Sequence, residues 1–254
     1  MFHKYVNKRQ TYSDLSEEYS KSIKWIYTQI HSYKVAEKTH RPRAINLVCD
    51  TTFYGKRQDK LGTVVFFDSI EKEVLLWNHV ESEKAQHYKE LLKELLLLGY
   101  TINSVTIDGK RGLYTVFKAY PVQMCHFHQK KTIRRYITKN PKLDASKDLK
   151  KILYNLTKTN ENNFKVKLQN WHVTHSEFLN EKTINGETGK FTFTHYKLRA
   201  AYMSLCSNFD HLFTYKNDKN LDIPNTTKKK VRTTNALSRV MNLKSFTISS
   251  NVSS

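Results

Sequence analysis

The stretch AINLVCD at residues 44–50, together with INSVTID at residues 102–108, decides the fold that we expect for this chain. The first stretch is a nearly unbroken apolar run of strand length, which is typical of a strand buried on both faces. The second also reads as a strand, and both stretches end in an aspartate, Asp50 and Asp108. Two β-rich runs at residues 61–67 and 74–77 lie between them, and their short polar connection indicates a hairpin.

Helical patterns alternate with the later strands. A helix that is capped by Ser82 and ends at Gly99 would turn five apolar side chains inward, namely Tyr88, Leu91, Leu92, Leu95 and Leu96. A second helix at residues 112–120 is stopped by Pro121, and a short fifth strand follows at residues 122–125. This order of elements predicts an α/β fold with a mixed five-stranded sheet and flanking helices.

A strong positive charge favours a polyanionic partner. The 254-residue chain has 43 Lys and Arg against 23 acidic residues, a formal net charge of +20 and a pI near 9.7. Nucleic acid is the first candidate, since each neutralised phosphate releases counterions. A membrane is less favoured, because no stretch reaches the roughly 18 apolar residues of a spanning helix and the N-terminus lacks the apolar core of a secretion signal. Three widely spaced cysteines indicate a reducing cytosol.

A small helical unit is predicted ahead of the sheet. Thr11 and Asp14 form a capping signal for a first helix. After residues 20–22, a second helix carries an apolar stripe of Ile23, Ile26, Tyr27 and Ile30. That stripe would leave three polar side chains exposed as candidate DNA contacts, Lys21, Lys24 and Gln29. Two short helices joined by a tight turn have the layout of a helix-turn-helix, but a hairpin that only packs on the next domain has the same pattern.

Asp50 and Asp108 are the most informative candidates for chemistry. A carboxylate at the end of a buried strand loses hydration, and two that converge repel each other. A divalent cation such as Mg²⁺ relieves both costs, and two such ions could activate a nucleophile and stabilise the leaving oxygen of a phosphodiester. The alternative is that both are turn or helix-cap aspartates, which are common after strands. The residues alone leave both interpretations open.

Six stretches resemble, in order and spacing, the transposases of bacterial insertion sequences in the Mutator-like branch of the DDE superfamily. They are LVCDTTFYG at 47–55, VTIDG at 105–109, MCHFHQ at 124–129, FLNEK at 178–182, FTHYKLRAAYMSL at 193–205 and IPNTT at 223–227. The resemblance covers residues 9–235, and the order of the motifs makes it specific. It implies an RNase H-like sheet with a helical insertion, in which Asp50 and Asp108 are the first two catalytic acids and bind Mg²⁺ or Mn²⁺.

The resemblance, taken with the composition, also implies a division of the chain. The parts are a helix-turn-helix-like DNA-binding unit at 1–34, a linker at 35–43, an RNase H-like catalytic core at 44–138, a helical insertion at 139–214 and a polar, basic remnant of the core's last helix at 215–254. The implied partners are double-stranded DNA and the inverted-repeat ends of the element, with a homo-oligomer forming on DNA. The implied location is the cytoplasm, on the nucleoid.

Cys125 and His128 match the family's C-x-x-H motif after the fifth strand. A zinc site needs about four ligands. His126 could add a third, but no second paired motif completes the set. We therefore favour a structural or active-site-shaping role for Cys125 and His128 over metal binding.

The third catalytic acid of the family is missing from its expected position. In the family it is a Glu on a helix that begins near a T-T-N motif. Two matches are possible here: Thr226-Thr227 is followed by Lys228 in place of Asn, and TTNAL at residues 233–237 is followed by Ser238 where Glu is expected. After Asp222 the sequence contains no Asp or Glu. We expect a frameshift or truncation within the gene and a copy that is defective in cleavage. Cleavage that depends on Asp50 would point to another acid, such as Glu181 or Glu187.

Two further functions fit the same sequence. One is a DNA-binding remnant without catalysis, which would recognise element ends through residues 11–33 and could repress intact copies. The other is an RNase H-like nuclease or resolvase unrelated to transposition, which would share the fold but not the order of the motifs.

Overall fold

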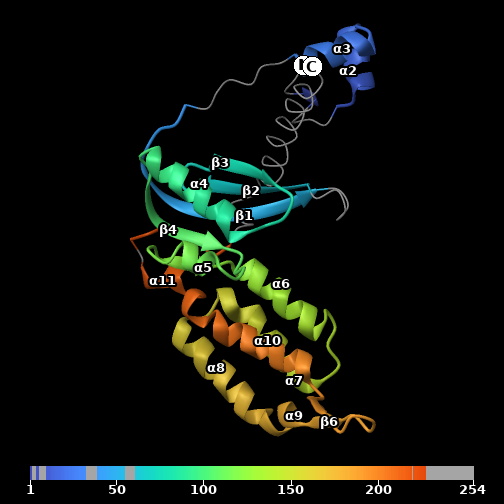
Figure 1. Cartoon of the computed structure of the whole chain (residues 1–254), viewed down its shortest axis with the longest axis vertical. Coiled ribbons are helices and arrows are strands. Elements are labelled where there is room, and N and C mark those ends of the chain that lie inside the picture. Colours follow the sequence, from blue (N-terminus) through green and yellow to red (C-terminus); the bar gives the residue numbers. More distant parts are fainter. Residues whose placement is uncertain (2–3, 6–9, 33–38, 55–60, 219, 227–254) are drawn as a thin grey trace. The chain divides into compact units, whose positions relative to one another are not determined.

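The structure, a computed structural model, describes residues 1, 4–5, 10–32, 39–54, 61–218 and 220–226. These residues form two compact units, one before residue 42 and one from Pro42 onward. Figure 1 labels many of their helices and strands.

The first unit contains two short helices, α2 (Tyr12–Tyr19) and α3 (Ile23–His31), as the sequence predicts. The capping box of α2 is also confirmed. The Asp14 amide donates to Thr11 Oγ1 at 3.1 Å, and the Thr11 amide donates to the Asp14 carboxylate at 2.7 Å. A turn that begins at Ser20, whose φ of 50° is left-handed, leads into α3.

The predicted apolar stripe of α3 is only half right. Ile26 and Ile30 are buried with Leu15 of α2, but Ile23 is 54% exposed and Tyr27 is 50% exposed. A single eight-residue helix covers only a narrow strip of its neighbour. The i, i+4 pair at the centre of the stripe is therefore buried, while its outer positions face solvent.

The second unit is an α/β structure built on a mixed five-stranded sheet, as predicted. Its strands are β1 (Ala44–Tyr54), β2 (Leu61–Asp68), β3 (Glu73–Val80), β4 (Thr101–Ile107) and β5 (Val122–Met124). Their spatial order is β3-β2-β1-β4-β5, and β3, β2, β1 and β4 are labelled in Figure 1. The pairs β1–β2 and β2–β3 are antiparallel, whereas β1–β4 and β4–β5 are parallel.

Strand β1 runs past Asp50, which the sequence places at the end of the strand. On one side β1 stays paired with β2 beyond this point, and Asp50 itself lies opposite Val65. On the other side the parallel ladder with β4 ends at Val48 and Thr106. Antiparallel pairing with β2 therefore keeps β1 extended beyond the end of its parallel pairing with β4. Asp50 lies just after the point where the pairing with β4 ends.

Helix α4 (Ala85–Leu97) covers the sheet by packing against β2 and β3. It buries four of the five predicted side chains, Tyr88, Leu91, Leu92 and Leu95, whereas Leu96 is exposed because it lies at the outer edge of this face. The predicted cap at Ser82 is wrong, since Lys84 occupies the N-cap position and residues 81–84 precede the helix. Helix α5 (Leu113–Val116) is shorter than predicted, because it ends at Phe117 in a turn that leads to Pro121.

The chain after β5 is mainly helical, as predicted. Its helices are α6 (His126–Ile137), α7 (Asp144–Tyr154), α8 (Glu161–Thr174), α9 (Ser176–Asn180), α10 (Tyr196–Ser207) and α11 (Thr214–Asn217), with short 3-10 turns η2 (Asn155–Thr157) and η3 (Phe209–His211) and a hairpin of β6 (Lys182–Ile184) and β7 (Phe191–Phe193). Helix α6 packs against α7 and α10, and a second hydrophobic core fills this part. Among the described residues, no helix has the length and apolarity to cross a membrane.

The last described residues return to the sheet. Thr106 Oγ1 of β4 donates to the carbonyl of Pro224 at 2.8 Å, and the His126 amide donates to the carbonyl of Asn225 at 2.9 Å. Ser238 and most of the predicted remnant at residues 215–254 lie outside the described residues.

Candidate functional site

The structure brings Asp50 and Asp108 together on neighbouring strands. The last parallel pair of β1 and β4 is Val48 with Thr106, so each aspartate lies two residues beyond it. Side chains alternate along a strand, so Asp50 projects from the same face of β1 as Val48. Asp108 directly follows Ile107, the last residue of β4. The charge of Asp108 lies near enough to raise the pKa of Asp50.

The electrostatics of the two aspartates are those of a crowded, dehydrated site. Burial raises the pKa of Asp50 to about 6; the imidazole of His128 lowers it, and the charge of Asp108 raises it. Burial also raises the pKa of Asp108, and the charge of Glu83 raises it further, while a hydrogen bond from the Lys110 amide and the charges of His128 and Lys110 oppose the rise. Both groups would therefore gain from an added cation.

Backbone amides orient both carboxylates in the same way. The Thr51 amide donates to Oδ1 of Asp50 at 3.0 Å, and the Lys110 amide donates to Oδ1 of Asp108 at 3.0 Å. Within the described part of the chain, Oδ2 of neither aspartate accepts a hydrogen bond. Each carboxylate thus keeps one oxygen available for a ligand.

Glu83 is a third acid at this site, and the sequence analysis missed it. It lies in the loop between β3 and α4 and is 15% exposed. Its Oε1 accepts a hydrogen bond of 2.6 Å from the Tyr88 hydroxyl, and its Oε2 lies 3.1 Å from Lys110 Nζ. Nothing in the sequence marks Glu83, because acidic residues at the start of a helix are ordinary.

Two chains of contacts connect Glu83 with the aspartates. The Tyr88 hydroxyl gives its only proton to Glu83, so Thr51 Oγ1 donates to the Tyr88 oxygen at 2.7 Å, and the Thr51 amide reaches Asp50. On the other side, the Lys110 ammonium binds the carboxylate and the main-chain carbonyl of Glu83, while the Lys110 amide binds Asp108.

His128 borders the same carboxylates from α6. Burial by itself lowers the pKa of His128, but its hydrogen bond with Cys125 and the charges of Cys125, Asp50 and Asp108 outweigh this, so the pKa is raised. Cys125 is buried at the N-cap of α6, where its Sγ lies 3.7 Å from Thr226 Oγ1. The pair therefore lies beside the aspartates, where it can shape the site.

His126 turns away from this pair and is not a candidate ligand. Its Nε2 lies 2.6 Å from the carbonyl oxygen of Leu212, and burial lowers the pKa of His126 to about 4. In the described ranges, no three His, Cys, Asp or Glu side chains lie in a group that could hold a metal ion. The site as described therefore offers two carboxylates as ligands, Asp50 and Asp108, with Glu83 held aside by Lys110.

Glu181 and Glu187, the other acids considered from the sequence, lie away from the site. Glu181 directly precedes β6, and its Oε2 lies 2.9 Å from Nε2 of His195. Glu187 is exposed in the turn between β6 and β7. Figure 1 shows β6 at the end of the helical part opposite the sheet.

In the first unit, the three candidate DNA contacts are exposed, as predicted. Lys21, Lys24 and Gln29 project from α3 or the turn before it. Lys21 Nζ lies 5.8 Å from the ring centroid of Trp25, which is 40% exposed. This surface combines positive charge with an aromatic side chain, which suits nucleic acid as well as a protein partner.

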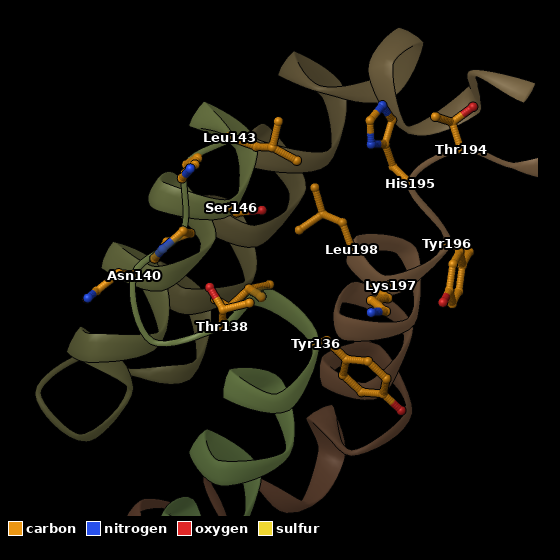
Figure 2. Close-up of a pocket in the computed structure, with 13 residues that line it drawn as sticks. Tyr136, Thr138, Asn140, Leu143, Ser146, Thr194, His195, Tyr196, Lys197 and Leu198 are labelled. Atoms are coloured by element: carbon orange, nitrogen blue, oxygen red, sulfur yellow. The ribbon is translucent and has the colours of Figure 1, made fainter.

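Away from the carboxylates, the helical part contains a pocket, shown in Figure 2. Its volume is about 510 Å³, and it lies between the segment joining α6 to α7 and the start of α10. Thr138, Ser146 and Leu198 face one another across it in Figure 2. Asp50, Asp108 and Glu83 do not line this pocket.

Comparison with models of known protein families gives no match for this chain, and comparison with curated proteins gives none either.

Proposed function

We propose that the chain is a transposase of the DDE, RNase H-like type, which binds duplex DNA and acts on phosphodiester bonds with divalent metal ions held by Asp50 and Asp108. The main support is the register of β1 and β4, in which Asp50 and Asp108 each lie two residues beyond the last parallel pair. The motif order that resembles insertion-sequence transposases adds to it. The strand order and the helical part after β5 are compatible with an RNase H-like fold carrying a helical insertion.

The donor set fits a hard divalent cation. Mg²⁺ and Mn²⁺ prefer carboxylate oxygens, and Asp50 and Asp108 each offer an Oδ2 that no described residue uses. Burial is the main cause of their raised pKa values, so both carboxylates would gain from a further positive charge. When bound, such an ion supplies Lewis-acid activation of the nucleophile and stabilises the leaving oxygen.

The residues of the chain would prepare this chemistry by orientation. The amides of Thr51 and Lys110 fix the two carboxylates before any ligand arrives, which reduces the reorganisation needed in the reaction. His128, whose pKa is raised, offers positive charge beside the aspartates for a phosphate oxygen. The net charge of +20 draws the DNA backbone toward the protein.

A second candidate function is a DNA-binding remnant without catalysis. The observation that favours it is Ser238, which follows TTNAL at the position where the family carries its third acid. Ser238 is neutral and cannot replace a charged ligand.

One experiment separates the two functions. Purified chain is incubated with supercoiled plasmid and Mn²⁺ or Mg²⁺, and nicking is measured beside DNA binding. Nicking that is lost in Asp50→Ala and Asp108→Ala supports the transposase, whereas binding without nicking supports the remnant. Mn²⁺ binding by calorimetry that neither substitution changes would contradict the metal site and the proposed function.

A further inference from the structure

We propose that Glu83 supplies the third carboxylate of the metal site, and that the Lys110 ammonium occupies it until a divalent cation binds. This rests on the proposed function, because it adds a ligand to the site of Asp50 and Asp108. Glu83 is the acid whose contacts lead to both aspartates, through Tyr88 and Thr51 on one side and through Lys110 on the other.

The position of Glu83 suits a ligand that moves. It precedes α4 in a loop, so its side chain can turn without unwinding a helix turn. One oxygen, Oε1, is oriented by the buried hydroxyl of Tyr88, which fixes the side of the carboxylate that faces the sheet. The other oxygen, Oε2, pairs with Lys110. Breaking that one ion pair releases an oxygen for a metal ion.

Lys110 has the geometry of an internal counter-ion. Its ammonium lies 3.1 Å from Oε2 of Glu83 and also donates to the Glu83 carbonyl, and its side chain is 31% exposed. The same residue holds Asp108 through its backbone amide. Without a metal, the Lys110 charge therefore pairs with Glu83 and also favours the ionised form of the neighbouring Asp108. A divalent cation brings twice that charge and would compete directly with the ammonium.

In the described part of the chain, no three-ligand group is formed, and the Glu83 carboxylate pairs with the Lys110 ammonium. Glu181 offers no alternative, because its carboxylate pairs with His195 next to β6.

The test is a Mn²⁺ titration by isothermal calorimetry on the full chain with four substitutions. Glu83→Gln should weaken Mn²⁺ binding about tenfold or more, since loss of supporting groups alone costs 10- to 100-fold in metal affinity. Lys110→Met should strengthen binding severalfold, because the competing ammonium is removed. The double variant should bind about as weakly as Glu83→Gln, since the Lys110 ammonium pairs with Glu83, and the backbone amide that holds Asp108 is kept in both variants.

The control is Glu81→Gln, in the same loop. Glu81 is exposed and makes no hydrogen bond or ion pair with a described residue, so its substitution should leave Mn²⁺ affinity unchanged. Circular dichroism and thermal unfolding without metal show whether each variant is folded, and Glu83→Asp keeps the charge if Glu83→Gln fails to fold. The Glu83→Asp variant should then bind Mn²⁺ with an affinity between those of wild type and Glu83→Gln.

The outcomes separate this inference from the proposed function. Binding that is lost in Asp50→Asn but equal in Glu83→Gln and wild type would overturn the role of Glu83 and leave the aspartate site intact. A gain in Lys110→Met that persists in the double variant would overturn the competition between Lys110 and the metal. Mn²⁺ binding that Asp50→Asn leaves unchanged would reject the aspartate site and the role of Glu83 together.

Discussion

Replacing Asp50 with Asn should stabilise the metal-free protein at neutral pH. Burial raises the pKa of Asp50 from 3.8 to about 6. An acid whose pKa is raised on folding lowers stability wherever it is ionised, because the folded state holds the charged form less readily than the unfolded chain does. The rise of about 2 pH units, at about 1.4 kcal/mol per unit, corresponds to about 3 kcal/mol at pH 7.5. This penalty is absent below the unfolded pKa.

The assay is urea denaturation in EDTA, followed by circular dichroism. At pH 7.5, Asp50→Asn should be more stable than wild type by about 2–3 kcal/mol. At pH 5, where folded Asp50 is mostly protonated, the gain should fall to about half, and near pH 4 it should be small. Asp210→Asn is the matched control, since Asp210 is exposed and makes no side-chain contact with the described residues through hydrogen bonds or ion pairs.

Equal stability of Asp50→Asn and wild type at pH 7.5 would refute this reasoning, as would a gain that stays constant toward pH 5. Either result would mean that the Asp50 carboxylate is hydrated or already compensated in the folded protein. Addition of Mn²⁺ should reverse the order of stability, because an ion that binds only the folded wild type stabilises it by mass action.

Three other predictions follow from the described contacts. Tyr88→Phe should lower metal-free stability by about 1–2 kcal/mol in urea denaturation, because it leaves Oε1 of Glu83 without its donor and Thr51 Oγ1 without its acceptor; unchanged stability would show that water replaces the hydroxyl. His126, whose pKa burial lowers from 6.5 to about 4, should contribute stability that is fully present above pH 6.5 and is lost as the pH falls toward 4; His126→Asn should flatten this acid limb, and an equally steep limb in the variant would contradict the assignment. Duplex DNA binding, measured by fluorescence anisotropy, should weaken steeply between about 50 and 200 mM salt, and Lys21→Ala with Lys24→Ala should reduce it more than Lys93→Ala on α4 does; equal effects would make α2 and α3 a packing element only.

The pair of aspartates could be predicted from the sequence because buried strands have a recognisable local pattern of apolar residues. The apolar run at residues 44–49 and the strand at 102–107 predict two buried strands, and an aspartate after each run places both at one edge of the sheet. The extension of β1 beyond Asp50 was not accessible, because it depends on pairing with β2 along residues that carry no apolar run. The exposure of Ile23 and Tyr27 was missed for a related reason. Periodicity identifies the apolar face of α3, but it does not show how much of that face the neighbouring helix α2 covers.

Glu83 could not be identified from the sequence, because only tertiary contacts connect it with the candidate site. The segment ESEKAQHYKE reads as the capped start of a helix, and the capping pattern was assigned to Ser82. In the structure the helix starts after Lys84, and Glu83 instead meets Tyr88 one turn into α4 and Lys110 beyond β4. The Glu83 to Lys110 contact joins residues far apart in the chain, and no local spacing specifies it.

The contacts around Glu83 also affect how the metal-free fold accommodates its buried acids. Burial raises the pKa of Asp50 to about 6, and the charge of His128 opposes this rise. Asp108 and Glu83 are compensated by Lys110, through its amide and its ammonium. The cation that stabilises the empty site is thus the one that a metal must displace, so metal affinity and metal-free stability are opposed at Lys110. Removal of the Lys110 charge should raise metal affinity and lower metal-free stability. If Lys110 only filled space, its substitution would not produce these opposite changes in metal affinity and metal-free stability.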